Sequence, residues 1–599
     1  MIKEAVRHIN TKEYIYLRSR NCLLFRIRTA REDIKNCILI YFARTNPMEK
    51  KEVKLVCKQR DALFDYYEAE VVFSKVARYQ KYYFKLESKS DEIIFVSSYG
   101  IYNQEPEDGY FEFLYANQND IYEIPDWSKG IIHYQIFPER FNNGIKENDR
   151  KDCVPWGSVP TRENYMGGDI KGITDKIGYL KELGIQCIYL NPIFLADFNH
   201  KYATTDYYEI DPEFGTAEEF RELVTVCHNN NIRIILDGVF NHTGVQFEPF
   251  RDLLINQEKS NYKDWFHVTE FPVTISHNCY ECVGAYKWMP RLNTSNPEVR
   301  HYILDIMAYW IEKFNIDGWR LDVADEVDSL VWQEARVIIK SQYPDKLLLG
   351  ETWGYGRSML RGDTLDSVMN YVFRDAVLEY FAIGKISTKE FDSRINQMLA
   401  AYPQEINQAL YNLLDSHDTD RFLTLCGENI DKFKLAIAFQ FLMMGSPAIY
   451  YGDEIGMTGG NDPDCRKAMV WDEAGQKNQL WQWYQWLIHI RKKYNCIRFG
   501  DYRTVLCEEE KNIYGFVRFV EDEEIYVVLH NGENTTTTEL PVLGKGKYVS
   551  LTDSEEYIAE NIVGEQKYYN GDILEYRGTI HIDFGTYSMK VIKKVNGGI

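Results

Sequence analysis

The spacing of apolar residues changes twice along this chain. In residues 1 to 125, apolar and polar residues alternate in short runs such as NCLLFRIRTA, CILIYFAR and IIFVSS. After residue 499 the alternation returns in YGFVRFV, EIYVVLHN and TIHIDFGTYSMKVI. An alternation of period two between Asn, Asp and Gly turns is typical of antiparallel strands. The pattern predicts a β-sandwich at each end of the chain.

The middle of the chain repeats a different unit, in which an apolar run is followed by a loop and an amphipathic helix. DKIGYLKELG and EVRHYILDIMAYWIEKF are two of these helices. Strands that alternate with helices in this way form parallel sheets, and eight repeats are typical of a (β/α)₈ barrel. The predicted barrel strands are residues 131–137, 185–193, 232–240, 316–324, 346–353, 367–373, 409–416 and 447–454.

The connection between the third and fourth predicted strands is too long for a simple loop. It is rich in aromatic residues, and a connection of this length is usually functional or a small subdomain. We therefore predict an α/β protein with five segments. These are an N-terminal β-sandwich (1–125), a first barrel part (126–242), an inserted subdomain (243–293), a second barrel part (294–499) and a C-terminal β-sandwich (500–599).

Composition narrows the classes of function. The net charge of −21 disfavours nucleic acid as a partner, because binding phosphates needs clustered Lys and Arg, and it suits a neutral substrate. No apolar run of 18 residues and no apolar signal region occur, so we expect neither a membrane span nor a leader. The 12 Cys residues follow no disulfide framework, and Cys279-x-x-Cys282 has no second pair that would complete a zinc site. These features predict a cytoplasmic protein.

Four acidic segments end predicted strands three, four, five and seven. They are IILDGVFNH, DGWRLDVADEV, LLLGETW and LLDSHDTDR. A single Asp at a strand end is more often a helix cap, and a lone His more often a core residue. Four such segments in one barrel, however, indicate one polar cluster, because the carboxyl ends of barrel strands meet where active sites form.

Three carboxylates in these segments suit the cleavage of a glycosidic bond: Asp322, Glu351 and Asp418. Such cleavage uses one carboxyl as proton donor and one as nucleophile or base. Arg320 lies two residues before Asp322, on the same face of the strand, where it would lower the pKa of that carboxyl and could also pair with Asp237. We expect Glu351, in contrast, to be buried and protonated near neutral pH.

The four segments resemble the four sequence regions of the α-amylase family, glycoside hydrolase family 13, whose members are retaining enzymes. The resemblance runs from about residue 130 to the C-terminus. It implies that Asp322 is the nucleophile, Glu351 the general acid/base and Asp418 the transition-state stabiliser. It also implies contacts with substrate for Tyr202, His242, Arg320 and His417, and for Asp462 and Arg466 in GGNDPDCRKAM.

A fifth segment, MPRLN (289–293), is similar to the MPKLN motif of the neopullulanase, cyclomaltodextrinase and maltogenic amylase group. That group carries an extra N-terminal β-domain. The resemblance implies that Val323, Glu326 and Trp353 shape the acceptor side of the site. Two residues depart from the pattern: Ala203 stands where an acid is usual, and Asp325 stands where Asn is usual. Asp325 leaves the balance between hydrolysis and transfer open.

The stretch FNNGIKENDR followed by MGGD resembles the calcium site of the same group. Calcium prefers oxygen ligands, and Ile145 here replaces an acid. An Asn- and Gly-rich turn without metal is the alternative. No organic cofactor is expected. The implied ligands are Asn143, Asn148, Asp149 and Asp169, with the carbonyl of Gly167.

The resemblance implies a hydrolase that cleaves α-1,4 and some α-1,6 glucosidic bonds of cyclodextrins, maltodextrins or pullulan. Three alternatives stay open: a 4-α-glucanotransferase, an α-1,6-specific or exo-acting glucosidase, and a non-catalytic glucan-binding protein. The expected partners are an α-glucan oligosaccharide and a second copy of the chain. The N-terminal domain has two readings: it is a carbohydrate-binding sheet, or, as the resemblance suggests, it covers the active site of a neighbouring copy in a dimer.

Overall fold

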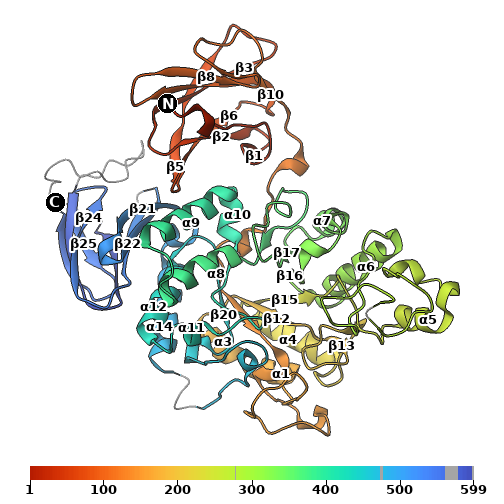
Figure 1. The fold of residues 1–599 in the computed structure, drawn as a ribbon. Helices are drawn as coiled ribbons and strands as arrows, with labels where there is room; N and C mark the ends of the chain where they lie inside the picture. Colours follow the sequence, from red (N-terminus) through yellow and green to blue (C-terminus); the bar gives the residue numbers. More distant parts are fainter. Residues whose placement is uncertain (277, 473–476, 522, 560–577, 596–599) are drawn as a thin grey trace.

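The computed structural model describes the chain except for residues 277, 473–476, 522, 560–577 and 596–599. It contains a β-sandwich at each end and a barrel between them (Figure 1), so the predicted fold class is confirmed. No helix in the described ranges combines the length and the apolar character needed to cross a bilayer.

The N-terminal domain is a sandwich of two antiparallel sheets. Their apolar faces meet over a core that includes Leu23, Phe25 and Phe84. One sheet has the order β1 (Ile15–Ser19), β2 (Cys22–Ala30), β6 (Phe64–Val72) and β5 (Val56–Arg60). The other has the order β4 (Lys51–Lys54), β3 (Ile34–Ala43), β7 (Arg78–Ser88), β8 (Ile93–Ser97) and β9 (Gly100–Tyr102), with β10 (Phe111–Tyr115) also paired to β7.

Eight parallel strands form the barrel, one for each predicted strand. In chain order they are β11 (His133–Ile136), β12 (Cys187–Leu190), β15 (Arg233–Gly238), β16 (Gly318–Leu321), β17 (Leu347–Gly350), β18 (Ser367–Val368), β19 (Tyr411–Asn412) and β20 (Ser446–Tyr450). Their order in the sheet is β18-β17-β16-β15-β12-β11-β20-β19, and a parallel bridge from Met369 to Tyr411 closes the ring.

The sixth strand is shorter than predicted. β18 ends at Val368, and the apolar run continues as helix α8 (Tyr371–Val377). Asn370 ends the strand because its side chain accepts a hydrogen bond from the backbone N–H of Phe373 and so caps the helix.

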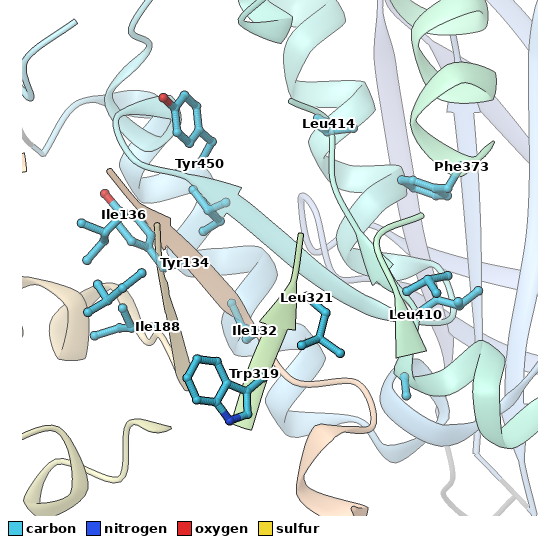
Figure 2. Close-up of a cluster of buried hydrophobic side chains, with 14 of the residues drawn as sticks. Ile132, Tyr134, Ile136, Ile188, Trp319, Leu321, Phe373, Leu410, Leu414 and Tyr450 are labelled. Atoms are coloured by element: carbon cyan, nitrogen blue, oxygen red, sulfur yellow. The ribbon is translucent and has the colours of Figure 1, made fainter. Parts of the chain in front are cut away.

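Helices surround the barrel and bury the outward face of its strands. Figure 2 shows part of this layer, in which Tyr134, Ile188, Trp319 and Leu321 belong to one buried hydrophobic cluster with residues of the helices. The main helices are α2 (Ile170–Asp175), α3 (Ile177–Leu183), α4 (Ala217–Asn229), α6 (Pro297–Phe314), α7 (Ser329–Gln342), α9 (Thr388–Ala401), α10 (Gln404–Ala409), α12 (Ile430–Leu442) and α14 (Gln479–Lys493). Since side chains alternate along a strand, the residues between these apolar ones point into the barrel.

The segment after β15 contains helix α5 (Glu248–Asn256) and lies to one side of the barrel (Figure 1). Isolated antiparallel bridges hold it together, including Val268 to Tyr280 and Cys282 to Pro290. A further bridge from His242 to Arg291 fastens the MPRLN segment to the end of β15. The insertion therefore ends beside the carboxyl ends of the barrel strands.

The C-terminal domain also has two sheets. One has the order β21 (Asp501–Glu508), β22 (Ile513–Val520), β23 (Glu523–His530), β28 (Ser588–Lys594), β25 (Gly546–Ser550) and β26 (Glu556–Ala559). The other pairs β24 (Thr536–Val542) with β27 (Gly578–Phe584). Lys58 of β5 lies 2.9 Å from Asp501 of β21, so the two terminal domains meet beside the barrel.

Candidate active site

Arg320 connects the carboxylates of three neighbouring strands. It lies between the outward-facing Trp319 and Leu321, so its fully buried side chain points into the barrel. Its Nη1 donates hydrogen bonds to Asp237 Oδ1 at 2.9 Å and to Asp322 Oδ1 at 2.8 Å. Its Nη2 lies 2.8 Å from Glu351 Oε1. The pairing of Arg320 with Asp237 that the sequence suggested is present.

The turn after Asp322 fixes Glu351 from the other side. The backbone N–H of Val323 donates a hydrogen bond to Glu351 Oε2 at 2.9 Å. Val323 has a φ of 36°, in the left-handed region that β-branched residues rarely adopt. Strained backbone of this kind occurs where a functional geometry requires it. Here the strained turn places the amide of Val323 on the carboxyl of Glu351.

The carboxyl cluster holds protons more tightly than isolated carboxyls do. Burial raises the pKa of Asp322 well above its ordinary 3.8 and raises the pKa of Glu351 above 4.5, while Arg320 lowers both. We expected Arg320 to dominate at Asp322, but burial has the larger effect there. The well-aligned hydrogen bond from Nη1 favours the ionised form of Asp322. Glu351 instead accepts its hydrogen bond from the neutral N–H of Val323, since Nη2 makes no aligned hydrogen bond to it. A charged donor favours the ionised form of a carboxyl more than a neutral donor does, so a proton shared by the cluster resides best on Glu351.

Asp418 follows β19 and is held by a loop that follows β20. Arg466 Nη2 lies 3.2 Å from Asp418 Oδ1, and Arg466 Nη1 lies 3.0 Å from Asp462 Oδ1. The Nε of Arg466 donates to the carbonyl of His417 at 2.8 Å. The structure thus brings Arg466, with Asp462 paired to it, against Asp418.

His417 and Tyr202 form a second hydrogen-bonded pair. The Tyr202 hydroxyl lies 2.7 Å from His417 Nε2 and donates to Asp237 Oδ2 at 2.8 Å. Burial lowers the pKa of His417 well below 6.5, so the imidazole is neutral. The amide of Gln135 donates to His417 Nδ1 at 2.8 Å, which places the ring proton on Nε2. His417 can therefore donate a hydrogen bond at the site.

His242 is buried without a well-formed hydrogen bond at either ring nitrogen, among the residues that the structure describes. Burial lowers its pKa to about 4, against a smaller raising effect of the Tyr202 backbone. The Oδ1 of the neighbouring Asn241 is also buried and without a partner in the described ranges. Since buried polar atoms are almost always paired, these groups are ready to bind the hydroxyls of a ligand.

On the side proposed for the acceptor, Trp353 presents a ring to solvent. Its side chain is 50% exposed, and it stacks on Tyr371 with ring centres 4.1 Å apart. Glu326 follows Asp322 by four residues, and the inserted segment holds it in place. Arg291 Nη2 donates to the Glu326 carbonyl at 2.8 Å, and Arg291 Nη1 lies 3.6 Å from Glu326 Oε2. The MPRLN segment therefore positions Glu326.

Three polar residues of the cluster were not predicted from the sequence: Gln135, Tyr189 and Asn191. Asn191 donates to Tyr202 at 2.9 Å, and Tyr189 donates to Asp237 at 2.6 Å. Asn191 directly follows a buried strand, as the predicted acids do, and this position was the available signal.

Some of the residues proposed for calcium lie together. Asn143 donates to Asp149 Oδ1 at 2.8 Å, and Gly167 lies so close to both that a side chain there would collide with them. The Oδ1 of Asn143 is buried and has no partner in the described part of the chain. An amide oxygen, a carboxylate and a backbone carbonyl fit the preference of calcium for oxygen ligands.

Asp169, another residue proposed for calcium, accepts backbone N–H groups at both of its carboxylate oxygens. It caps helix α2 through Gly172 and also binds the N–H groups of Gly144 and Ile145. Asn148 lies in the short helical turn Lys146–Asn148. No group of three or more His, Cys, Asp or Glu that could hold a metal occurs within the described residues.

Comparison with known proteins gives consistent matches. Residues 135–500 match the family described as alpha amylase, catalytic domain, and residues 1–117 match alpha amylase, N-terminal ig-like domain. A cyclomaltodextrinase of Geobacillus thermopakistaniensis is 42% identical over 577 residues, covering 94% of this chain and 96% of the relative. Neopullulanase 2 of Thermoactinomyces vulgaris is 41% identical over 97% of this chain and 99% of its own length. A solved cyclomaltodextrinase structure superposes with a TM-score of 0.92 at 36% identity, covering 99% of this chain and 100% of that one.

Proposed function

Because this chain belongs to the α-amylase family and is a glycoside hydrolase, we propose that it cleaves α-1,4 and some α-1,6 glucosidic bonds of cyclodextrins, maltodextrins or pullulan. The observation that carries the proposal is the guanidinium of Arg320, which joins the carboxylates of Asp237, Asp322 and Glu351. A retaining glycosidase needs two carboxyls close together in different protonation states. The shared guanidinium and the uneven hydrogen bonding supply that arrangement.

In the proposed mechanism Glu351 protonates the glycosidic oxygen while Asp322 attacks the anomeric carbon and forms a β-linked glycosyl-enzyme. Asp418, held by Arg466, stabilises the positive charge that develops on the sugar. The leaving sugar then departs. In the second step Glu351 takes a proton from water, and the water attacks the anomeric carbon and releases Asp322. Both steps invert the configuration, so the product keeps the α-configuration.

His242, His417 and Tyr202 are proposed to bind the sugar whose bond is cleaved. Neutral imidazoles suit this role, because they can exchange hydrogen bonds with sugar hydroxyl groups, which carry no charge. Trp353, Glu326 and Val323 are proposed to bind the acceptor, which is water in hydrolysis and a sugar in transglycosylation. The exposed ring of Trp353 is a surface on which an acceptor sugar can stack.

Calcium is proposed as a structural ion held by Asn143, Asp149 and the Gly167 carbonyl. The ion would supply a positive charge that keeps the loop after β11 against Gly167. The unpaired, buried Oδ1 of Asn143 supports the proposal. Addition of a chelator should then lower the melting temperature, and calcium should restore it; equal melting curves with and without chelator would refute the ion.

Two further features of the protein in the cell are proposed. The first is a homodimer formed through the N-terminal domain, where Met48, Leu63 and Val72 are apolar and largely exposed. Sedimentation at several concentrations would show a mass of twice the chain, whereas a monomer at all concentrations would refute it. The second is a cytoplasmic location, which is supported by the absence of a disulfide at any of the 12 cysteines, all within the described ranges.

Chromatography of the products tests the activity. The pure protein is incubated with β-cyclodextrin, maltoheptaose, pullulan and soluble starch. Opening of the cyclodextrin ahead of starch would support the proposed substrates. Longer oligosaccharides from maltoheptaose would instead assign a 4-α-glucanotransferase, and no reaction with any substrate would leave a glucan-binding protein without catalysis.

A further inference from the structure

Arg162, in the loop between β11 and α2, is linked to the active site by a series of ion pairs. Its Nε donates a hydrogen bond to Asp462 Oδ2 at 3.1 Å. Asp462 Oδ1 lies 3.0 Å from Arg466 Nη1, and Arg466 Nη2 lies 3.2 Å from Asp418 Oδ1. The series therefore runs from Arg162, whose side chain is 61% exposed, to the acid proposed to stabilise the transition state.

The turn that carries Arg162 is held in a fixed shape by two side chains. The backbone N–H of Thr161 donates to Asn164 Oδ1 at 2.9 Å, and the N–H of Asn164 donates to Thr161 Oγ1 at 3.0 Å. Hydrogen bonds of this kind replace backbone hydrogen bonds in tight turns. Because Arg162 lies between these two residues, its backbone is fixed and its side chain starts from a defined point.

One buried arginine, Arg140 of helix α1 (Pro138–Phe141), ties this turn to the loop after β20. Its Nη2 donates to the carbonyl of Asn164 at 2.9 Å, and its Nε donates to the carbonyl of Arg466 at 3.1 Å. The side chain is 1% exposed, and a buried charge that loses such partners is costly. The two loops are therefore held together from below, and the contact of Arg162 with its acid is more than a chance meeting of two surface chains.

The order of the barrel strands places Arg162 opposite the residues proposed for the acceptor. Arg162 and Asp462 follow β11 and β20, which are neighbours in the ring. Val323 and Trp353 follow β16 and β17, which lie four strands away from β20 and β11 in the ring of eight. The acceptor carries the reducing end of the substrate, so a sugar chain that crosses the opening from that side reaches Arg162 with its non-reducing end.

Arg162 has hydrogen-bond donors to offer at that end. Only its Nε is used within the chain as the structure describes it, which leaves Nη1 and Nη2 facing solvent. A guanidinium presents its N–H groups in fixed directions, and the carboxylate of Asp462 beside it is an acceptor. A donor and an acceptor side by side suit two neighbouring hydroxyl groups of a sugar ring, because each hydroxyl both donates and accepts.

We propose that Arg162, together with Asp462, binds the sugar at the non-reducing end of the substrate. By fixing that end at a set distance from Asp322, the pair determines which bond of an oligosaccharide is cleaved. Arg162 is thus a specificity-determining residue of the donor side. This inference rests on the proposed function, which supplies an α-glucan chain that lies across the opening of the barrel.

The cleavage pattern of maltoheptaose labelled at its reducing end tests the proposal. In the wild type, initial rates should favour one bond at a fixed distance from the non-reducing end. In Arg162→Ala, the ratio of the preferred cleavage to the next most frequent one should fall about 2- to 10-fold, the effect of one or two exposed hydrogen bonds. The KM should rise while kcat changes little, because the lost contact stabilises the bound substrate and the transition state alike.

Three further variants separate this role from a structural one. Arg162→Lys keeps a charged donor and should recover part of the preference. Asp462→Asn should blunt the preference too, and the double variant with Arg162→Ala should add little to the larger single effect, because the two residues act as a pair. Arg221→Ala is the matched control, since Arg221 is a partly exposed arginine 3.7 Å from Glu218 on the outer helix α4, and it should leave the pattern unchanged.

The remaining outcomes count against the proposal. An unchanged cleavage pattern in Arg162→Ala, or an equal loss of rate at every bond, would overturn the role of Arg162 and leave the proposed function standing. A wild type that cleaves maltoheptaose at all bonds alike would do the same. No cleavage of maltoheptaose, β-cyclodextrin or pullulan by the wild type would overturn the proposed function, and this inference with it.

Discussion

At the scale of single residues, the site depends on how one guanidinium is divided among three acids. Arg320 makes aligned hydrogen bonds to Asp237 and Asp322 but only a charge contact to Glu351. Burial raises the pKa of Glu351, so its proton is retained at a pH at which an exposed Glu is ionised. The activity that depends on this proton should therefore be lost as the pH rises through the pKa of Glu351.

The proposed role of Glu351 as proton donor predicts how its replacement by Gln changes the rate. Glu351→Gln cannot transfer a proton, so kcat should fall by ~10²–10⁴, the usual share of a general acid. Steady-state kinetics on β-cyclodextrin would measure this, and the alkaline limb of the pH profile should disappear in the variant. Asp322→Ala should abolish turnover with an unchanged melting curve. Substantial activity in either variant would reassign the residue.

A second residue-scale prediction concerns His133, at the base of the barrel interior. Its pKa is lowered from 6.5 to about 3 by burial, so the folded protein binds fewer protons there than the unfolded chain does. The stability that this neutral histidine contributes is complete above pH 6.5 and is lost as the pH falls toward 3. The loss is up to about 1.4 kcal/mol per pH unit.

His133→Gln removes this titration while keeping a polar side chain of similar size. The melting temperature of the variant should therefore fall less than that of the wild type between pH 7 and pH 5. Calorimetric scans of both proteins at several pH values give the comparison. Parallel curves for the two proteins would show that the group does not titrate as described.

At the scale of elements, the inserted segment after β15 holds residues next to the active site. Its MPRLN end is paired with the strand-end residue His242 through Arg291, and the same arginine holds Glu326. Arg291→Ala should release Glu326 and change the ratio of transfer to hydrolysis products a few-fold, with little effect on kcat for water. Product ratios from maltotriose would show this. Arg300→Ala is the control, because Arg300 pairs with Glu334 away from the cleft.

Elements with a clear period were predictable, and those without one were not. All eight barrel strands overlap the predicted segments, because a buried apolar run bounded by polar residues marks a strand; β20 begins one residue before its predicted start. The predicted length of the strand at 367–373 was wrong, because periodicity alone does not separate a short buried strand from the start of a helix. The acids and Arg320 could be predicted as site residues because charged side chains at the ends of buried strands are unusual. Gln135 and Asn191 carry no charge, so the position of Asn191 after a strand was the one available signal, and only the folded structure shows that both residues contact His417.

At the scale of the whole molecule, a buried arginine of the N-terminal domain contacts the barrel part of the chain. Arg26 pairs with Glu68, and its Nη1 donates to the Ala400 carbonyl at the end of α9 at 2.7 Å. Breaking such a pair leaves a buried charge without its partner. Arg26→Leu should therefore cost about 3–5 kcal/mol of stability.

The cost should appear as an early transition of the N-terminal domain in calorimetry, with turnover of β-cyclodextrin kept below that transition. Lys58→Ala removes a more exposed pair between the terminal domains and should cost less than about 1 kcal/mol. Equal effects of the two variants would contradict the central role of Arg26.

The short strands β18 and β19 determine where the barrel should open locally. Each contributes two residues to the ring, and the single bridge from Met369 to Tyr411 joins them, whereas β11 and β12 pair over four. Local opening of a sheet begins where the fewest backbone hydrogen bonds must break. Tyr371, on which the ring of Trp353 stacks, lies two residues after Met369, the residue that forms this bridge. Trp353 thus rests on the part of the barrel that should open at least cost, whereas Asp322 and Glu351 follow β16 and β17, which pair with each other over four residues.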